Sequence, residues 1–197
     1  MNPIDKLIKA LSKFPGVGSK SAARIAYHIM RDKTENVSDL VNAIANVKKK
    51  IKLCSECFNL TEDDPCYICS NPRRNNKSVC IVEDPQDASA IESTGTFKGV
   101  YHILHGAISP LDGVGPENIK VKELVQRLEK NAIKELIVAT NPTIEGEATA
   151  HYITKIARPY KIRLSRIAFG IPFGGDIEYT DKSTLSRALE SRLEIKE

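Results

Sequence analysis

The chain has 197 residues, 41% of them hydrophobic and 27% charged, and a formal net charge of +4. These are ordinary values for a globular protein with either one domain and small modules or two modest domains. No apolar run approaches the roughly 20 residues of a membrane-spanning helix. Residues 1–11 alternate charged and apolar residues at helical spacing, unlike a secretory signal. We therefore expect a cytoplasmic protein that has no membrane partner.

The positive charge is concentrated at the N-terminal end. Residues 1–53 contain eleven Lys and Arg against four Asp and Glu, whereas residues 54–78 and 79–197 are each slightly acidic. A basic segment in an otherwise balanced chain indicates a surface for a polyanion. The lysine run at 48–52 by itself is interpreted as a solvated face.

Three helices are predicted ahead of the cysteines. Apolar residues recur at helical spacing over residues 4–11 and 19–31, with a Pro-Gly-Val-Gly break at 15–18 between them. Ser19 is the predicted N-cap of the second helix, and Ser38 is the predicted N-cap of the third. This part of the chain is therefore expected to be entirely helical.

The cysteine spacing is the most specific signal. Two Cys-x-x-Cys pairs are separated by eight residues, and their members are Cys54, Cys57, Cys66 and Cys69. Each pair places both sulfurs on one side of a tight turn, and two such turns form the tetrahedral thiolate cage that Zn²⁺ prefers. Four thiolates leave no open coordination position, so we expect one structural zinc ion. The alternatives are two disulfides or a redox pair, which the absence of an export signal and a leftover fifth cysteine disfavour.

The fifth cysteine and the histidines carry no comparable signal. Cys80 stands between Val79 and Ile81 in an apolar strand, so it is expected to be a small buried side chain. The histidines are scattered, and none has metal-ligand spacing to a second one. Core or surface roles are therefore expected for His28, His102, His105 and His151.

A glycine turn joins the first two helices. Glycines at 16 and 18 permit backbone conformations that bring amide groups close to a ligand, at the positive end of the second helix. That helix also carries a basic stripe, which consists of Lys20, Arg24, His28 and Arg31. We expect DNA backbone phosphate to be contacted by Gly16, Gly18, Lys20 and Arg24. The alternative is a plain helix–helix turn with a solvated face.

After the cysteines the pattern changes to strands that alternate with helices. Strands are predicted at 79–83, 100–104, 136–139 and 162–169. Helices are predicted at 85–92, 119–130, 146–157 and 183–192. Continuous apolar strands alternating with helices indicate a parallel sheet that is covered on both faces.

This second half resembles the Toprim fold of topoisomerases and primases. Enzymes with that fold pair a glutamate after the first strand with an Asp-x-Asp after a later one, and these carboxylates bind Mg²⁺ for phosphoryl transfer. Glu83 ends the first predicted strand, but Thr140-Asn141-Pro142 follows the third strand where the aspartates would stand. Glu145 and Glu147 are the only substitutes nearby, so the sequence favours a protein without catalytic chemistry.

Taken in order, the modules resemble the RecR family of bacterial recombination mediators over essentially the whole chain. The resemblance rests on the cysteine cluster and on the stretches 14–22, 109–116, 140–150 and 170–179. His105 stands where that family often has glycine. The fold implied is multi-module α+β: a helix-hairpin-helix region (1–53), a four-cysteine zinc finger (54–78), a Toprim-like α/β domain (79–168) and a C-terminal strand/helix tail used for oligomerisation (169–197).

The resemblance also implies a function. Proteins of this family bind gapped, single- and double-stranded DNA without sequence preference, act with RecO and RecF, and help RecA replace single-stranded-DNA-binding protein. They are non-enzymatic, and several form homo-oligomeric rings, including tetramers. Carried onto this chain, Lys20 and Arg24 would contact DNA, the cysteines would hold zinc, and the face around Glu83 and Glu145 would meet RecO.

Two other functions stay open at this stage. One is a Mg²⁺-dependent nuclease or topoisomerase-like enzyme that uses Glu83, Glu145 and Glu147, against which the missing aspartate pair counts. The other is a zinc-ribbon adaptor that binds only protein, against which the charge asymmetry and the glycine turn count. The sequence does not fix ring size or strand preference.

Overall fold

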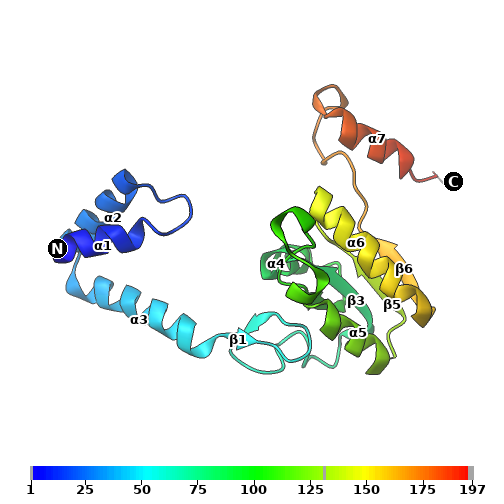
Figure 1. Cartoon of the computed structure of the whole chain (residues 1–197), viewed down its shortest axis with the longest axis horizontal. Coiled ribbons are helices and arrows are strands. Elements are labelled where there is room, and N and C mark those ends of the chain that lie inside the picture. Colours follow the sequence, from blue (N-terminus) through cyan, green and yellow to red (C-terminus); the bar gives the residue numbers. More distant parts are fainter. Residues whose placement is uncertain (1, 131, 195–197) are drawn as a thin grey trace. The chain divides into compact units, whose positions relative to one another are not determined.

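A computed structural model describes residues 2–130 and 132–194 of the chain (Figure 1). They form two units, Met1–Ile51 and Lys52–Glu197, which are treated separately below. Across the described residues, no helix combines the length and the apolar character that crossing a membrane requires.

The first unit contains α1 (Pro3–Leu11), α2 (Ser19–Arg31) and α3 (Thr34–Lys50). Its buried side chains are few: Ala22 and Ala26 on α2 are fully buried, while no residue of α1 or α3 is. The small alanine side chains allow α1 and α2 to pack closely.

Two predicted caps in this unit are wrong. The N-cap of α2 is Gly18, one residue before Ser19, and no side chain caps that helix. The third helix begins at Thr34, well ahead of Ser38. The cause of the earlier start is Asp32, whose carboxylate accepts hydrogen bonds from the Lys33 backbone N–H (2.8 Å) and the Asn36 side chain (2.8 Å) and so stabilises the first turn.

In the second unit the cysteine region opens with a small antiparallel pair, β1 (Lys52–Leu53) and β2 (Leu60–Thr61). The main sheet follows with β3 (Asn75–Val82), β4 (Gly99–Ile103), β5 (Glu135–Val138) and β6 (Arg163–Arg166). Its strand order is β4-β3-β5-β6, and all neighbours are parallel, as predicted.

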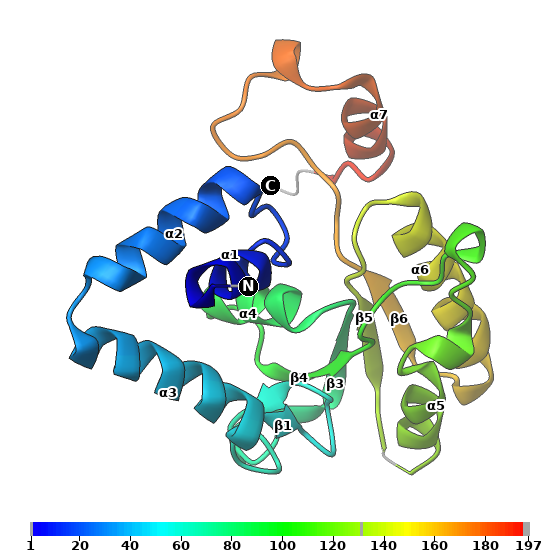
Figure 2. The same cartoon turned by 60° about the vertical axis from the view of Figure 1, so that its left-hand side comes forward.

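Three helices cover the sheet: α4 (Pro85–Ser93), α5 (Val121–Lys130) and α6 (Ile144–Ala157). Figures 1 and 2 show α4 on one face and α5 and α6 on the other. The chain places β4 on one side of β3 and then crosses to place β5 on the other side. Right-handed crossovers in opposite directions along a sheet put their helices on opposite faces. They also create a crevice at the carboxyl ends of β3 and β5, where α/β proteins bind ligands.

The sheet forms the centre of the core. The residues of β3 from Val79 to Val82 and those of β4 are buried on both faces, which explains their continuous apolar pattern. Large side chains buried against them include Leu124 of α5 and Ile153 of α6. This double burial made the strands recognisable in the sequence.

Strand ends differ from the prediction where a strand lacks a neighbour or a hydrophobic pattern. The last strand ends at Arg166 rather than 169, because its only partner, β5, ends at Val138. β3 begins at Asn75, within the region expected to lack long regular elements, since its first residues are polar and exposed and carry no apolar signal. The tail contains a 3-10 turn (Ile177–Tyr179) and α7 (Lys182–Glu190), so of the predicted strand/helix tail the described residues form only the helix. Pro172 and its neighbouring glycines are poor strand formers.

Candidate metal centre and nucleic-acid surface

Four cysteine sulfurs gather at one point in the second unit. The ligand atoms of Cys54, Cys57, Cys66 and Cys69 all lie within 4.8 Å of one another, and the Cys57 and Cys66 sulfurs are 3.5 Å apart. A tetrahedron with metal–sulfur distances of about 2.3 Å separates its sulfurs by about 3.8 Å. The cluster therefore has the dimensions of a zinc site, and all of its cysteines are free rather than joined in disulfides.

Local backbone hydrogen bonds shape the two turns that present these sulfurs. In the first turn the Cys54 N–H donates to the Asn59 carbonyl (2.8 Å) and the Phe58 N–H donates to the Cys54 carbonyl (3.0 Å). Phe58 adopts a left-handed conformation with φ of 63° to close that turn. In the second, the Ser70 N–H donates to the Cys66 carbonyl (2.9 Å). Both pairs are thus held in place by the chain around them.

The electrostatics of the cluster fit a divalent cation. Hydrogen bonds from neighbouring cysteines, Cys69 first, lower the pKa of Cys57 to about 6. The hydrogen bond with Cys57 raises the pKa of Cys69 well above its ordinary value, and burial and the neighbouring thiolates add to this. Four thiolates at this spacing need a cation among them, and Zn²⁺ bound to four thiolates has no position left for a substrate. The site is structural.

The zinc module is attached to the sheet through Phe58 and its neighbour Cys57. The Ile103 N–H donates to the Cys57 carbonyl (2.9 Å), and the His105 ring donates from Nε2 to the Phe58 carbonyl (2.7 Å). The Phe58 ring packs edge-on against His102, with ring centroids 5.4 Å apart. We refer to these contacts as the module–sheet seam. The core or surface roles expected for the histidines hold for buried His102, but the sequence did not predict that Phe58, His102 and His105 join the module to the sheet.

The two seam histidines have distinct roles. His102 is fully buried and donates from Nε2 to the Lys120 carbonyl (2.7 Å), and burial lowers its pKa to about 4, so it is neutral. His105 has φ of 58°, a left-handed conformation that glycine adopts without strain. The one signal in the sequence was the expectation, from the family resemblance, of glycine at the position of His105. Cys80 is buried as predicted, and burial raises its pKa to about 12.

The glycine turn of the first unit leaves an open surface. Gly16 has φ of 76°, and a Cβ added at Gly16 or Gly18 would meet nothing within 4 Å. The first internal α2 bond runs from the Ala22 N–H to the Gly18 carbonyl (2.9 Å). Because no side chain caps α2, the amides of its first turn are available to an external acceptor such as a phosphate.

The basic stripe of α2 lies on the side away from its packing face. Lys20, Arg24, His28 and Arg31 are all exposed, whereas Ala22 and Ala26 are fully buried. Lys20 and Arg24 are one helical turn apart and follow the open amides directly. The sequence-predicted residues Gly16, Gly18, Lys20 and Arg24 thus come together at one end of α2.

The carboxyl edge of the sheet holds Glu83 in a closed arrangement. Its Oε1 accepts from the Asn141 backbone N–H (2.9 Å) and its Oε2 accepts from the Asn141 side chain (2.6 Å), and only 7% of the residue is exposed. Gly146 has no room for a Cβ, which would meet the Asn141 carbonyl and Glu83 Oε1. Asn141 therefore satisfies both oxygens of Glu83.

Glu145 and Glu147, two further glutamates at this edge, are half-buried. One oxygen of Glu147 contacts Arg166 (3.1 Å) and Arg187 (2.7 Å), and both guanidinium groups stack on the Phe169 ring. Within residues 2–130 and 132–194, the cysteine quartet is the only group of three or more possible ligands brought together as a metal site. The three glutamates do not form one.

Comparisons with known proteins identify related sequences along the whole chain. Family models match in order: RecR helix-hairpin-helix at residues 4–48, the RecR four-cysteine zinc finger domain at 51–71, Toprim domain at 77–168 and RecR C-terminal at 170–192. "Recombination protein RecR" of Anaeromyxobacter sp. (strain Fw109-5) is 50% identical over 194 residues, which is 98% of each chain. The protein of the same name from Koribacter versatilis (strain Ellin345) is 50% identical over 98% of this chain and 97% of its own.

Proposed function

Because the chain belongs to the RecR family of recombination proteins, we propose that it is a non-enzymatic recombination mediator that binds gapped DNA in the cytoplasm. In this role it acts with RecO and RecF and helps RecA replace single-stranded-DNA-binding protein. The observation that carries the proposal is the exposed stripe of α2 beside uncapped helix amides. A reducing compartment suits it, since the zinc ligands must stay thiolates.

The DNA contact proposed for α2 is to backbone phosphate. Lys20 and Arg24 supply charge, and the turn at Gly16 to Gly18 lets a phosphate approach the helix amides without meeting a side chain. Contacts of this kind position a protein on DNA without reading bases, so we expect single- and double-stranded regions of any sequence to bind.

For RecO we propose the carboxyl edge of the sheet. Glu145 is accessible there, and Glu83 underneath fixes the loop at Asn141 rather than meeting the partner itself, since it is almost fully buried. Substitution of Glu145 would then weaken RecO binding directly, whereas substitution of Glu83 would act through the loop.

A Mg²⁺-dependent nuclease or topoisomerase is the alternative function. What disfavours it is the pairing of Glu83 with Asn141 and of Glu147 with two arginines, because neither carboxylate is left open to an ion. The test is incubation of supercoiled DNA with the protein and Mg²⁺ or Mn²⁺. Metal-dependent nicking that disappears in Glu83→Gln would replace the mediator proposal with this one.

We also propose a homo-oligomer, with a tetrameric ring as one form. Its support is apolar surface that the chain leaves uncovered. On α3, the side chains of Leu40, Val41, Ile44 and Val47 are each about half exposed or more, and in the tail Phe173, Tyr179 and Leu193 are almost fully exposed. Monomeric proteins rarely leave such surface open.

The experiment that tests DNA binding compares Lys20→Ala, Arg24→Ala and Lys49→Ala on gapped DNA over a salt series. Removing one phosphate contact should flatten the slope of log affinity against log salt by about 0.7 to 0.9. Lys49, exposed in the last turn of α3, is the matched control for removal of one charge. Mass measurements on each variant check that assembly is unchanged.

The outcomes separate the remaining functions. Weakening by the first two variants alone supports the α2 surface. Weakening by Lys49→Ala alone would place the DNA surface at the lysine run of α3. If the wild-type protein shows no salt-dependent binding at all, the chain is a zinc-ribbon adaptor for protein partners and not a DNA-binding mediator.

A further inference from the structure

A row of cationic residues lies at the amino edge of the main sheet, opposite the carboxyl edge described above. The Lys134 N–H donates to the Lys77 carbonyl (2.8 Å), and the Arg163 N–H donates to the Lys134 carbonyl (2.9 Å). These backbone bonds bring the chain segments at Lys77, Lys134 and Arg163 together near the starts of β3, β5 and β6, where Arg163 is in register with Glu135. Neighbouring strands are about 4.8 Å apart, so the row is roughly 10 Å long.

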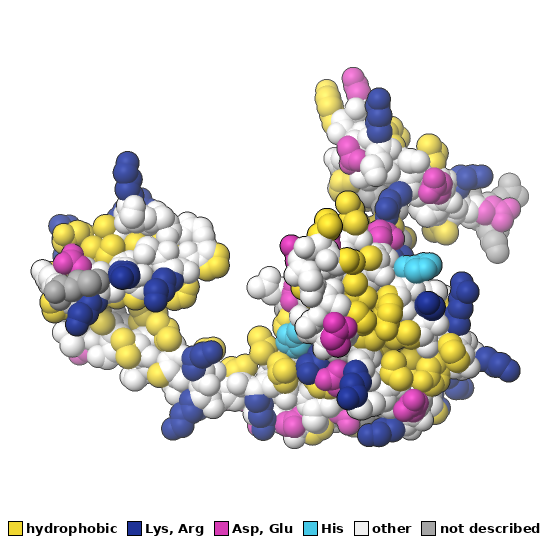
Figure 3. Space-filling view, viewed as in Figure 1, with side chains coloured by type: hydrophobic (Ala, Val, Ile, Leu, Met, Phe, Trp, Pro, Cys, Tyr) yellow, Lys and Arg dark blue, Asp and Glu magenta, His cyan; other side chains and the backbone are white. Residues whose placement is uncertain are grey.

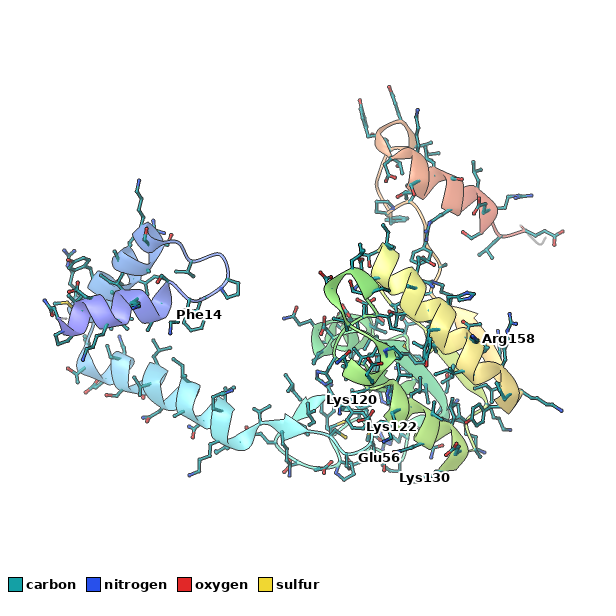
Figure 4. All side chains as sticks on the ribbon, in the orientation of Figure 1. Phe14, Glu56, Lys120, Lys122, Lys130 and Arg158 are labelled. Atoms are coloured by element: carbon teal, nitrogen blue, oxygen red, sulfur yellow. The ribbon has the colours of Figure 1, made fainter. Side chains whose placement is uncertain are left out.

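Two more cations extend this row. Lys130 is the last residue of α5, and Figure 4 shows it at the lower end of that helix. Lys161 is held in a left-handed turn with φ of 53°, two residues before β6 begins. All members of the row are exposed. We call Lys77, Lys130, Lys134, Lys161 and Arg163 the amino-edge row, and Figure 3 shows Lys and Arg side chains along this lower rim of the second unit.

The charges of the row are largely uncompensated. Among residues 2–130 and 132–194, no ion pair involves the lysines of the row, which are Lys77, Lys130, Lys134 and Lys161. Arg163 makes a long contact of 3.5 Å to Glu135, with 78% of the arginine side chain exposed. Glu135 also accepts a hydrogen bond from the Ser78 hydroxyl (2.9 Å). An exposed carboxylate, Glu129, lies at the end of α5 beside Tyr160. The five cations of the row outnumber the three neighbouring carboxylates, which are Glu129, Glu135 and Glu56 of the hollow described next.

A hollow of about 390 Å³ adjoins the row on the side of the zinc module. Lys77 and Arg127 line it together with Glu56 and Cys69. Arg127 donates from Nη1 to the Tyr101 carbonyl (2.6 Å), but its buried Nε finds no acceptor in the described part of the chain. A buried donor without an acceptor is costly, and the Arg127 guanidinium adds positive charge to the wall of the hollow.

We propose that the amino-edge row is a second DNA-contact surface that binds backbone phosphate independently of α2. The proposal rests on the DNA-binding function proposed above and adds a site to it. A row about 10 Å long with flexible lysine ends spans two to three phosphates, given one charge per about 3.4 Å along each strand. Cations outnumber carboxylates along this edge, so its local potential favours the approach of a polyanion.

The test uses the full-length protein and compares two double variants that each remove two positive charges. Lys77→Gln/Lys134→Gln removes the centre of the row. Lys122→Gln/Lys182→Gln is the matched control, since both residues are exposed and start α5 and α7 away from this edge. Because all the substituted side chains are exposed, melting temperatures should be unchanged and any difference reports binding. Binding to gapped DNA is measured over a salt series, and a photocrosslinker on Lys134→Cys identifies what touches the edge.

The row variant should lower the salt slope by about 1.4 to 1.8, and the control should leave it unchanged. The crosslinker should attach to DNA. Equal slopes for the two variants, with binding still weakened by Lys20→Ala, would overturn the second surface and leave the α2 proposal standing. A crosslink to protein instead of DNA would overturn it too, and would indicate an acidic protein partner. Absence of DNA binding by the wild-type protein itself would overturn both proposals.

Discussion

The zinc module and the parallel sheet adjoin in one unit, yet they are ordered by different means. In the module, both strands of the β1–β2 pair are only two residues long, and the fully buried side chains are mainly the cysteines. In the sheet, β3 from Val79 onward and the whole of β4 are buried on both faces. Burial of apolar area supplies the sheet's stability, whereas the module lacks that area and depends on its ion. The two regions are in contact, but different interactions stabilise their folded structures.

The largest effect is expected from a zinc ligand. Cys66→Ser removes one of four thiolates, and structural zinc contributes on the order of 10 kcal/mol to the folding of such modules. We expect the variant to lose its zinc and to exchange its backbone amides rapidly over residues 54–71. Metal analysis and hydrogen exchange measure this. Cys80→Ala is the control, since it removes a buried sulfur outside the cluster. Full zinc content and an unchanged melting temperature in Cys66→Ser would contradict a structural metal.

An intermediate effect is expected from the sheet. Leu136 of β5 is fully buried, and replacing a buried leucine by alanine lowers the free energy of unfolding by about 2 to 5 kcal/mol. The variant should still bind one zinc ion. Leu111→Ala serves as the control, because Leu111 is 98% exposed and should change stability by less than about 0.5 kcal/mol. Loss of zinc in Leu136→Ala would show that the two regions do not fail separately.

An effect that is small near neutral pH and grows only in acid concerns His102, where the two regions meet. Its pKa is about 4 in the folded protein, below its ordinary value of 6.5, because it is buried. The unfolded chain therefore binds a proton first as the pH falls. Above pH 6.5 His102 does not lower the free energy of unfolding. As the pH falls from 6.5 towards 4, protonation of His102 in the unfolded chain lowers that free energy by roughly 1.4 kcal/mol per pH unit. His102→Gln should have a shallower pH dependence in this range. Denaturant unfolding with zinc content measured at each pH checks this, and identical slopes would exclude His102 as the cause.

The contrast between the zinc module and the sheet also explains how far the sequence could predict the structure. Doubly buried strands and Cys-x-x-Cys pairs leave strong patterns, so the parallel sheet, its alternation of strands and helices, and all four zinc ligands could be predicted. The hydrogen bonds of Asp32 just ahead of α3 could not, because a side chain that bonds to its own neighbours resembles any polar residue. Neither could the seam, because Phe58, His102 and His105 meet only after the chain has folded. The closed pairing of Glu83 with Asn141 was visible in the sequence only as a missing aspartate.

The seam has a consequence for how the protein responds to its surroundings. Since the Cys57 and Phe58 carbonyls accept hydrogen bonds from the sheet, a correctly folded sheet holds the first cysteine turn in its metal-binding shape. Coupling of this kind is reciprocal. If the folded sheet raises the affinity for zinc by some factor, bound zinc raises the equilibrium constant for folding of the sheet by the same factor. A newly made chain that has not yet folded will then compete poorly for scarce zinc, and a finished one will retain the ion against chelators. Metal occupancy becomes a marker of completed folding.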